Sequence, residues 1–229
     1  MYGLEKLRAE VAVFNNANKL YKKGLALMPV CFGISFTNTL MNQARALVHV
    51  YTDGSVAIST GAVEMGQGVN TKIVQVAAQV FSISADKIKI NSTNTYRIAN
   101  TSPSAASATA DLNGKATLNA CIAILERIKQ VAATELNTSA DLITIKEEWV
   151  YSDGVKTAID WKKIVMMTYV KRISLSEHGH YATPEIHFDK TKEKGHPFAY
   201  HVFGTAIITA TVDCLRGTYE FDSVKLVHD

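Results

Sequence analysis

The sequence predicts an α+β fold in which β-hairpins and helices follow one another without a regular rhythm. Two Asp-Gly pairs, at residues 53–54 and 153–154, each separate two runs of strand-forming residues, which is the pattern of a hairpin turn. Two longer segments, residues 70–83 and about 107–136, repeat apolar residues at helical spacing instead. Because strands and helices do not alternate as β-α-β units, a doubly wound parallel sheet is disfavoured.

The N-terminal stretch, residues 1–22, is predicted to be a leading helix. Leu4, Leu7, Val11 and Phe14 recur on one face of this helix, with charged residues opposite them. The apolar face is expected to dock against the rest of the chain.

The part that follows, residues 23–137, is predicted to alternate strands, loops and helices. Strands are expected around Pro29 and on both sides of the first Asp-Gly turn. A glycine-containing loop, residues 61–68, precedes the first of the two longer helices, for which Asn70 is the expected N-cap. A half-buried strand in DKIKINST and a loop of small polar residues then lead into the second.

The last part, residues 138–229, is predicted to consist of hairpins and sheet around one helix. The helix is expected over DWKKIVMMTYV, after the second Asp-Gly hairpin. Strands are expected from Ile173 onward, with turns at Lys194-Gly195 and Arg216-Gly217.

Composition narrows the classes of protein. The 229 residues are 47% hydrophobic, enough for a core of one or two domains. The 24 basic and 21 acidic residues give a net charge of only +3 without a basic tract, so a nucleic-acid partner is not expected. No apolar run approaches the roughly 20 residues of a membrane span, and the start lacks the apolar stretch of a secretory signal. We therefore expect a cytoplasmic protein without a membrane segment.

The cysteines predict no ligand set. Cys31, Cys121 and Cys214 are far apart and never in C-x-x-C spacing, so they are expected to be reduced core thiols. Zinc or iron–sulfur ligation by this chain is accordingly not expected.

The loop Glu64-Met65-Gly66-Gln67-Gly68 is the first candidate site. Its two glycines allow backbone N–H groups to come close to a polar ligand, and the Gln67 carboxamide can make a directed hydrogen bond. Two glycines before a helix also form ordinary turns, and no Walker A or dinucleotide fingerprint accompanies them.

The second candidate is the run Thr101–Thr109, TSPSAASAT, which puts hydroxyls and small side chains at the start of the long helix. Free N–H groups and the positive end of the helix dipole favour an anion there. An ordinary capping run is the alternative interpretation.

Five histidines of the C-terminal part, at positions 178, 180, 187, 196 and 201, raise a third possibility, a metal site. His178 and His180 alternate along a predicted strand and so share one face of it. No cysteine or carboxylate cluster completes a ligand set, and a Tyr- and His-rich strand surface explains the pattern more simply. No nucleophile–base–orienter set is present either.

At these same loops the sequence closely resembles the molybdopterin-binding large subunit of the xanthine dehydrogenase and xanthine oxidase family. The resemblance is collinear from about residue 23 to the C-terminus, with a variable insert near residues 138–160. The matching stretches are FGISFTNTLMNQARALVHVYTDGSVAIST, GAVEMGQGVNTK, TNTYRIANTSPSAASATADLNGKA, ISLSEHGHYATPEIHFD and PFAYHVFGTAIITATVDCLRG.

The resemblance implies a hydroxylase whose molybdenum is held by a pterin dithiolene and not by protein side chains. Hypoxanthine and xanthine, oxidised to urate, are the implied substrates, because the SPSAAS run is similar to xanthine-type and not to aldehyde-oxidase-type relatives. Carried over by position, the residues expected to contact the cofactor are Met65, Gly66, Gln67, Ala106, Ser107, Ala108 and Thr109.

Four residues are expected, on the same resemblance, to contact the substrate. Ala105 and Ala106 are small enough to leave room for a flat purine beside the metal. Phe36 and Thr37 would stack on that ring and hydrogen-bond to it, a stacking contact of about 1 kcal/mol beyond burial. Without the resemblance, Phe36 is simply a core phenylalanine.

The resemblance also implies partners. The family's GGGFGGKE, RGFGG and GEPP segments, the last with its glutamate base, have no counterpart here. The chain is therefore expected to be part of a larger subunit, inactive alone, that joins the remaining molybdenum-binding segments. FAD and 2Fe-2S centres are expected only on other domains or subunits. The alternatives are a non-catalytic cofactor-binding or assembly module, an aldehyde oxidase-type subunit and, far behind, a small metallohydrolase that uses the histidines.

Overall fold

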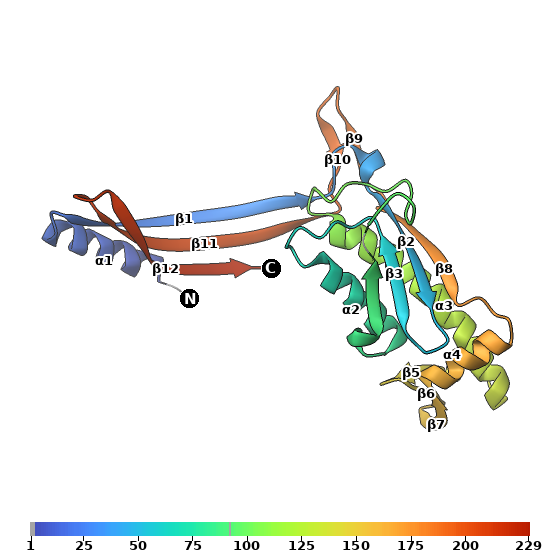
Figure 1. Cartoon of the computed structure of the whole chain (residues 1–229). Helices are drawn as coiled ribbons and strands as arrows, with labels where there is room; N and C mark the ends of the chain where they lie inside the picture. The colour runs from blue at the N-terminus through green and yellow to red at the C-terminus, as the bar shows by residue number, and fades with distance from the viewer. Residues whose placement is uncertain (1–2, 92) are drawn as a thin grey trace. The chain divides into compact units, whose positions relative to one another are not determined.

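The computed structural model describes residues 3–91 and 93–229, and it forms two compact units (Figure 1). One unit combines Met1–Ile34 with Tyr200–Asp229, and the other spans Ser35–Ala199. Helices and sheets, mostly antiparallel, occur in both, so the predicted α+β class is confirmed. None of the helices in these described residues is long and apolar enough to cross a membrane.

The first unit is a three-stranded antiparallel sheet with one helix against it. The sheet has the order β1-β11-β12, and its elements are α1 (Leu4–Ala17), β1 (Tyr21–Ile34), β11 (Tyr200–Asp213) and β12 (Thr218–His228). Asn15 fastens α1 to β1, because its side chain donates to the Lys23 carbonyl (2.9 Å) and accepts from the Lys23 N–H (2.7 Å). The leading helix is thus confirmed, although it ends before residue 22.

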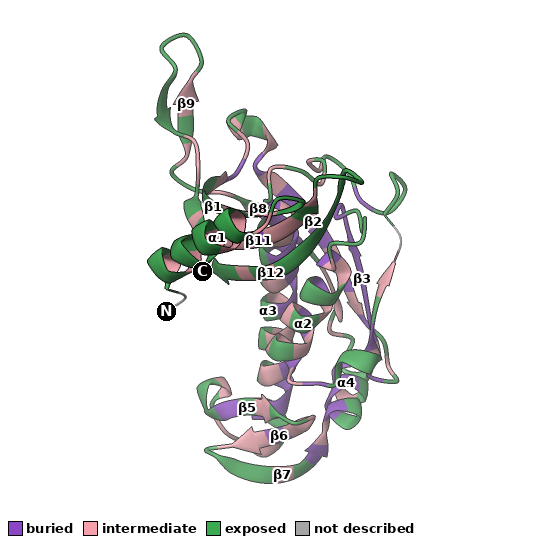
Figure 2. Ribbon diagram, turned by 90° about the vertical axis from the view of Figure 1, so that its left-hand side faces the viewer, coloured by how far each residue is buried: buried purple, intermediate pink, exposed green. Residues whose placement is uncertain are grey.

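The sheet of the first unit leaves large apolar side chains exposed. On β1, Met28 is 62% and Phe32 is 48% exposed, and on β11 Phe203 is 56% exposed. On β12, Phe221 and Leu226 are more than half exposed, and Figure 2 shows α1, β1 and β12 mostly in the colour of exposed residues. The sheet therefore exposes apolar side chains of the kind that proteins usually bury, and no other described part of its own unit covers these side chains.

The second unit is built on a four-stranded sheet with the order β4-β3-β2-β8. Strand β2 is antiparallel to β3 and β8, whereas β3 and β4 are parallel. The elements of this layer are β2 (Gln43–Val50), β3 (Val56–Thr60), β4 (Ile88–Asn91), β8 (Ser176–Ala182), α2 (Val69–Phe81) and α3 (Thr109–Leu136).

Alternation along β2 explains why the helices cover one face of this sheet. Ala44, Ala46, Val48 and Val50 are buried, whereas the residues between them are half-buried. Fully buried side chains of the strands and of both helices form the core, which includes Ile58, Ile73, Phe81, Ile124 and Ile128.

A smaller sheet, β5-β6-β7, and a helix complete this unit, together with a separate hairpin. The elements are β5 (Ile143–Lys146), β6 (Trp149–Ser152), β7 (Val155–Asp160), α4 (Trp161–Val170), β9 (His187–Asp189) and β10 (Lys194–His196). Three short 3₁₀ turns lie at Thr39–Met41, Ala85–Lys87 and Ala140–Leu142. Both predicted Asp-Gly hairpins are confirmed, as β2-β3 and β6-β7.

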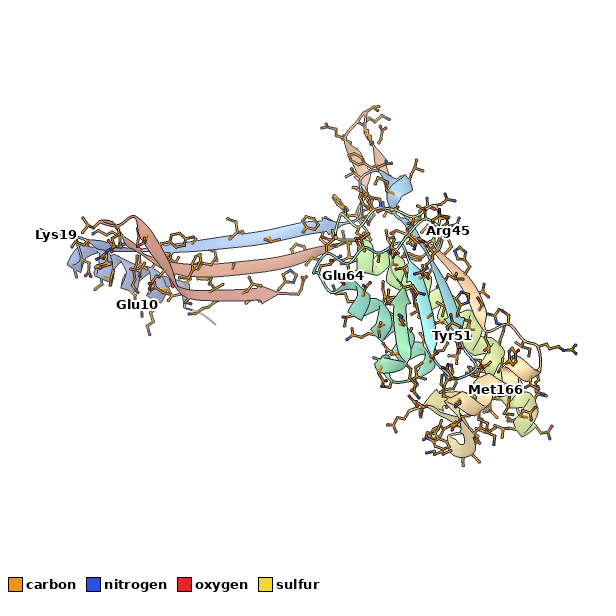
Figure 3. All side chains as sticks on the ribbon, viewed as in Figure 1. Glu10, Lys19, Arg45, Tyr51, Glu64 and Met166 are labelled. Carbon is orange, nitrogen blue, oxygen red and sulfur yellow. The ribbon has the colours of Figure 1, made fainter. Side chains whose placement is uncertain are left out.

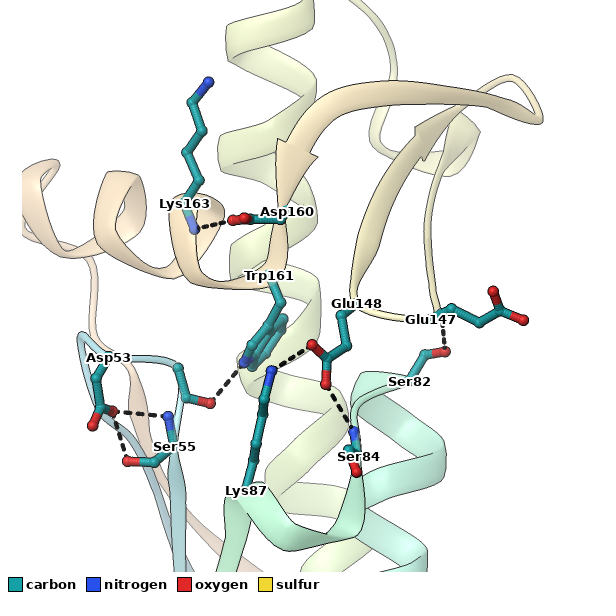
Figure 4. Close-up of polar contacts among 11 residues, drawn as sticks. Asp53, Ser55, Ser82, Ser84, Lys87, Glu147, Glu148, Asp160, Trp161 and Lys163 are labelled. Carbon is teal, nitrogen blue, oxygen red and sulfur yellow. Dashed lines mark hydrogen bonds and ion pairs between the residues drawn. The ribbon is translucent and has the colours of Figure 1, made fainter.

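Two contacts tie α4 and the β5-β6 turn to the turns beside the large sheet (Figure 4). The indole of Trp161, 1% exposed, donates to the carbonyl of Gly54 in the first hairpin turn (2.8 Å). The carboxylate of Glu148 pairs with Lys87 and accepts from the Ser84 N–H (3.1 Å). The Lys87 ammonium and the Ser84 N–H lower the pKa of Glu148.

Three sequence predictions are wrong in detail. Helix α2 begins at Val69 after a left-handed Gly68, so Asn70 lies in its first turn and is not the N-cap. Gly195 lies in β10 and not in a turn. Glycine is required there because a Cβ would overlap the backbone of His187 on the paired strand. Of the three thiols only that of Cys121 is buried, whereas Cys31 and Cys214 are exposed.

Candidate functional site

Strand directions bring the predicted site segments to one edge of the four-stranded sheet. Strands β3 and β4 are parallel, so the loops after them, residues 61–68 and 93–108, leave from the same edge. Strand β2 runs the opposite way, so the segment before it, residues 35–42, meets them there. Helices α2 and α3 both begin at this edge, which we call the loop edge and define by these three segments (Figure 1).

Direct contacts join the two candidate loops. The Val63 N–H donates to Ser104 Oγ (2.8 Å), and Thr93 Oγ1 donates to the Ala62 carbonyl (2.8 Å). A Cβ at Gly61 would overlap the side chain of Thr101, so the closeness of the loops depends on glycine. The GQG and SPSAAS loops are therefore neighbours in space.

The segment with Phe36 and Thr37 is held beside the SPSAAS loop. The Ser35 N–H donates to the Ala106 carbonyl (3.4 Å). Asn42, 2% exposed, accepts from the Phe36 N–H (2.8 Å) and donates to its carbonyl (2.9 Å). The Phe36 side chain is half-buried and Thr37 is exposed, so neither residue belongs to the buried core.

Glu64 organises the GQG loop from within. Its Oε1 accepts from the N–H groups of Gly66 and Gly68 (both 2.9 Å), and its Oε2 accepts from that of Asn70 (3.1 Å). These donors, with Asn70 the strongest, lower the pKa of Glu64. Figure 3 shows this side chain near the start of α2.

Gln67 is folded back onto the same loop. Its Nε2 donates to the Val63 carbonyl (2.8 Å), and its Oε1 accepts from the Met65 N–H (2.6 Å). A carboxamide has two hydrogens and two acceptor lone pairs, so one of each is left for a ligand. The side chain of Met65 is 67% exposed.

The SPSAAS loop approaches α3 through a strained turn. Ala106 and Ser107 both have left-handed backbones, with φ of 54° and 53°. For residues with a Cβ this conformation costs about 1 kcal/mol each. Ala108, which precedes the first turn of α3, supplies no side-chain cap, so the capping alternative for this run gains no support.

Buried polar atoms at this edge supply a test of whether the residues fit a polar cofactor. Thr101 Oγ1, Asn70 Oδ1 and Asn113 Oδ1 are buried and have no hydrogen-bond partner in the described part of the chain. Such atoms are uncommon in folded proteins. They belong to the SPSAAS loop, to the first turn of α2 and to the second turn of α3, so unpaired polar atoms gather near this edge, as expected beside a polar cofactor.

A cavity of about 270 Å³ opens at the same edge, and Glu64, Asn70, Asn91 and Thr93 are among its lining residues. Gln67 and Ser107 do not line it. The sequence identified the two loops by their glycine and hydroxyl patterns. It gave no role to Asn42 or to Glu64, which hold their segments. An acid just before a helix start was the available signal for Glu64.

The histidines form no metal centre among residues 3–91 and 93–229, where no cluster of three or more potential ligands exists. His178 and His180 do share the exposed face of β8, and His180 Nε2 lies 3.3 Å from Gln43 Oε1. The metallohydrolase alternative therefore gains no support.

Comparison with known families agrees with this geometry. A family model described as the molybdopterin cofactor-binding domain matches residues 1–229. The chain belongs to this family. Its cofactor is molybdopterin, which is thus the polar group expected at the loop edge.

Relatives of this molybdopterin-binding domain are xanthine dehydrogenases. It is 41% identical over 222 residues to "Xanthine dehydrogenase" of Oryza sativa subsp. japonica, covering 97% of the chain and 15% of the relative. It is 41% identical over 216 residues to "Xanthine dehydrogenase/oxidase" of Gallus gallus, covering 94% and 14%. The chain thus spans about 15% of the length of the relatives it matches.

Solved structures share the fold at low identity. CO dehydrogenase from Oligotropha carboxidovorans has a TM-score of 0.81 at 19% identity, covering 99% of this chain and 29% of that one. The aldehyde oxidoreductase from Desulfovibrio desulfuricans has a TM-score of 0.74 at 17% identity, covering 99% and 22%. At these identities the likeness concerns the fold of the domain alone.

Proposed function

We propose that this domain supplies one wall of the cofactor and substrate site of a molybdenum hydroxylase that oxidises purines. The observation that supports this most is the meeting of the GQG loop, the SPSAAS loop and the Phe36 segment at one edge, with unpaired buried polar atoms of Asn70, Thr101 and Asn113 nearby. When bound, the cofactor supplies the metal and its redox chemistry. The protein's own task is to hold, orient and enclose.

The cofactor contacts in this proposal come from both loops. Gln67 offers its remaining Nε2 hydrogen to the pterin, while Met65 and Gly66 border the ring. Ser107, Ala108 and Thr109 receive the phosphate end at the start of α3, where the helix dipole favours negative charge.

The substrate contacts come from the other two segments. Ala105 and Ala106 leave space for a flat ring, and Phe36, whose backbone Asn42 fixes, packs against that ring, while Thr37 supplies a hydroxyl. The names of similar relatives favour xanthine over an aldehyde, and hypoxanthine is proposed as the second purine substrate. We therefore favour the hypothesis of a purine-oxidising enzyme over the aldehyde oxidase-type alternative.

The partners in this proposal are the remaining molybdenum-binding segments and the FAD- and iron–sulfur-carrying parts of the same enzyme. The exposed apolar residues of β1, β11 and β12 support it, since a sheet with this much apolar surface is suited to burial against further protein. The domain acts in the cytoplasm and without a membrane or nucleic-acid partner.

A chimera tests the proposal. The matching segment of the Gallus gallus relative is replaced by this chain, and bound molybdenum and xanthine oxidation are measured against the parent enzyme. We expect stoichiometric molybdenum and measurable xanthine oxidation. Ala106→Trp should abolish turnover, because the indole fills the space beside the metal.

The control is Ala182→Trp at the end of β8, an exposed alanine outside the three loop-edge segments, which should leave turnover within about twofold. A chimera that melts like the parent but holds no molybdenum contradicts the proposal. Cofactor retention without oxidation of purines or aldehydes supports the non-catalytic binding module instead.

A further inference from the structure

The GQG loop has no regular secondary structure before Val69, yet its shape is fixed by hydrogen bonds. Three alternate backbone N–H groups, those of Gly66 and Gly68 in the loop and of Asn70 in the first turn of α2, donate to one carboxylate, that of Glu64. Gly66 and Gly68 both have positive φ, 100° and 75°, which turns their N–H groups inward. Together these N–H groups form a ring of donors around Glu64.

An anionic ligand could not use these same donors while Glu64 is in place. The three N–H groups are occupied, and the carboxylate brings a negative charge of its own to the start of α2. Charged acceptors make hydrogen bonds about twice as strong as neutral ones, so Glu64 competes well for these groups. Helix α3 differs, since Ala108 supplies no side-chain cap at its start.

The ring also determines where Gln67 lies. Gln67 stands between Gly66 and Gly68, both of which donate to Glu64, so its Cα is held at two sides. The side chain then reaches back to Val63, whose own N–H is bound to Ser104 of the other loop. The hydrogen bonds of Glu64, of Gln67 and of Val63 therefore belong to one network, which links the backbone of the GQG loop to Ser104 of the SPSAAS loop.

We propose that Glu64 is a positioning residue, which holds Gln67 toward the cofactor and keeps the cofactor's anionic end away from the start of α2. This inference rests on the proposed function in so far as it concerns the cofactor. Its structural half, the ring of donors closed by a carboxylate, stands without any cofactor.

The structural half is tested on the whole chain by NMR-detected hydrogen exchange at neutral pH. We expect the amides of Gly66, Gly68 and Asn70 to exchange about tenfold faster in Glu64→Gln, because a neutral acceptor replaces the carboxylate. Glu126→Gln is the matched control, since Glu126 pairs with Lys129 on the exposed side of α3, and it should leave these rates unchanged. Unchanged rates of the three amides in Glu64→Gln overturn the inference, as does unprotected exchange of these amides in the unmodified chain.

The functional half is tested in the chimera by the rate at which pterin is released, read from the fluorescence of the oxidised pterin. We expect release about tenfold faster in Glu64→Gln than in Glu126→Gln, at an unchanged melting temperature. Equal release rates in a chimera that retains its pterin overturn the role of Glu64 alone. A chimera without pterin even when Glu64 is intact overturns the proposed function instead, while the exchange rates in the chain still decide whether the ring exists.

Discussion

At the scale of single residues, the loop edge is held by side chains that bind backbone groups. Asn42 does for Phe36 what a neighbouring strand would do, since it satisfies both the N–H and the carbonyl of that residue. Glu64 satisfies three N–H groups in the same way. Loops without regular structure acquire a defined shape when such side chains replace missing backbone partners.

Removal of the Asn42 side chain should therefore be costly. Asn42→Ala leaves the N–H and carbonyl of Phe36 without these partners in a half-buried place, so we expect a loss of about 2 kcal/mol in the free energy of unfolding. Asn38→Ala is the control, because Asn38 is exposed and its side chain caps no helix, and it should change stability by less than about 0.5 kcal/mol. Equal denaturation midpoints for the two variants would show that Asn42 does not hold this segment.

Sequence patterns identified the candidate loops but did not predict the roles of Asn42 and Glu64. Gly66, Gly68 and the small residues of SPSAAS stand out because their types are unusual in a run. Asn42 and Glu64 do not, since an isolated Asn or Glu is ordinary on any surface. Their importance comes from which backbone groups they reach, and that depends on the folded positions of the loops.

At the scale of elements, the close contact of β8 with α3 sets the geometry of the second unit. Gly179 lies directly against the backbone of α3 at Ala116, where a Cβ would overlap the carbonyl oxygen. On either side, Asn119 donates to the His180 carbonyl (2.8 Å) and Arg127 pairs with Glu177 (2.8 Å). The helix is thus fastened to the strand along its length, which helps to set where its N-terminal turn meets the loop edge.

Gly179→Ala should separate these two elements. We expect a loss of about 2 to 3 kcal/mol in the free energy of unfolding, the usual cost of forcing an extra carbon into a packed contact. Gly24→Ala, on β1, is the matched control, because a Cβ there meets nothing within 4 Å. If chemical denaturation gives the same destabilisation for both variants, the close approach of β8 and α3 is not what requires glycine.

The elements themselves were largely predictable, whereas their partners were not. Apolar spacing identified α2 and α3, and the Asp-Gly pairs identified two hairpins, because these signals are local. The parallel pairing of β3 with β4 was missed, since it joins strands separated by a whole helix. The error at Gly195 is of the same kind, because that glycine serves a cross-strand contact with His187 and not a turn.

At the scale of the whole molecule, the chain consists of two units that differ in how far their apolar residues are buried. The second unit, Ser35–Ala199, has its own core between a sheet and two helices. The first unit, by contrast, exposes apolar residues along all three of its strands. This difference agrees with the proposal that the first unit packs against further protein.

A crystal structure of the chimera with its cofactor will show whether the GQG and SPSAAS loops bind one cofactor together. We expect a single pterin within hydrogen-bond distance of Gln67, with its phosphate at the N–H groups of Ser107, Ala108 and Thr109. A pterin that touches only one of the two loops, or a phosphate bound at the start of α2 in place of Glu64, would contradict this expectation.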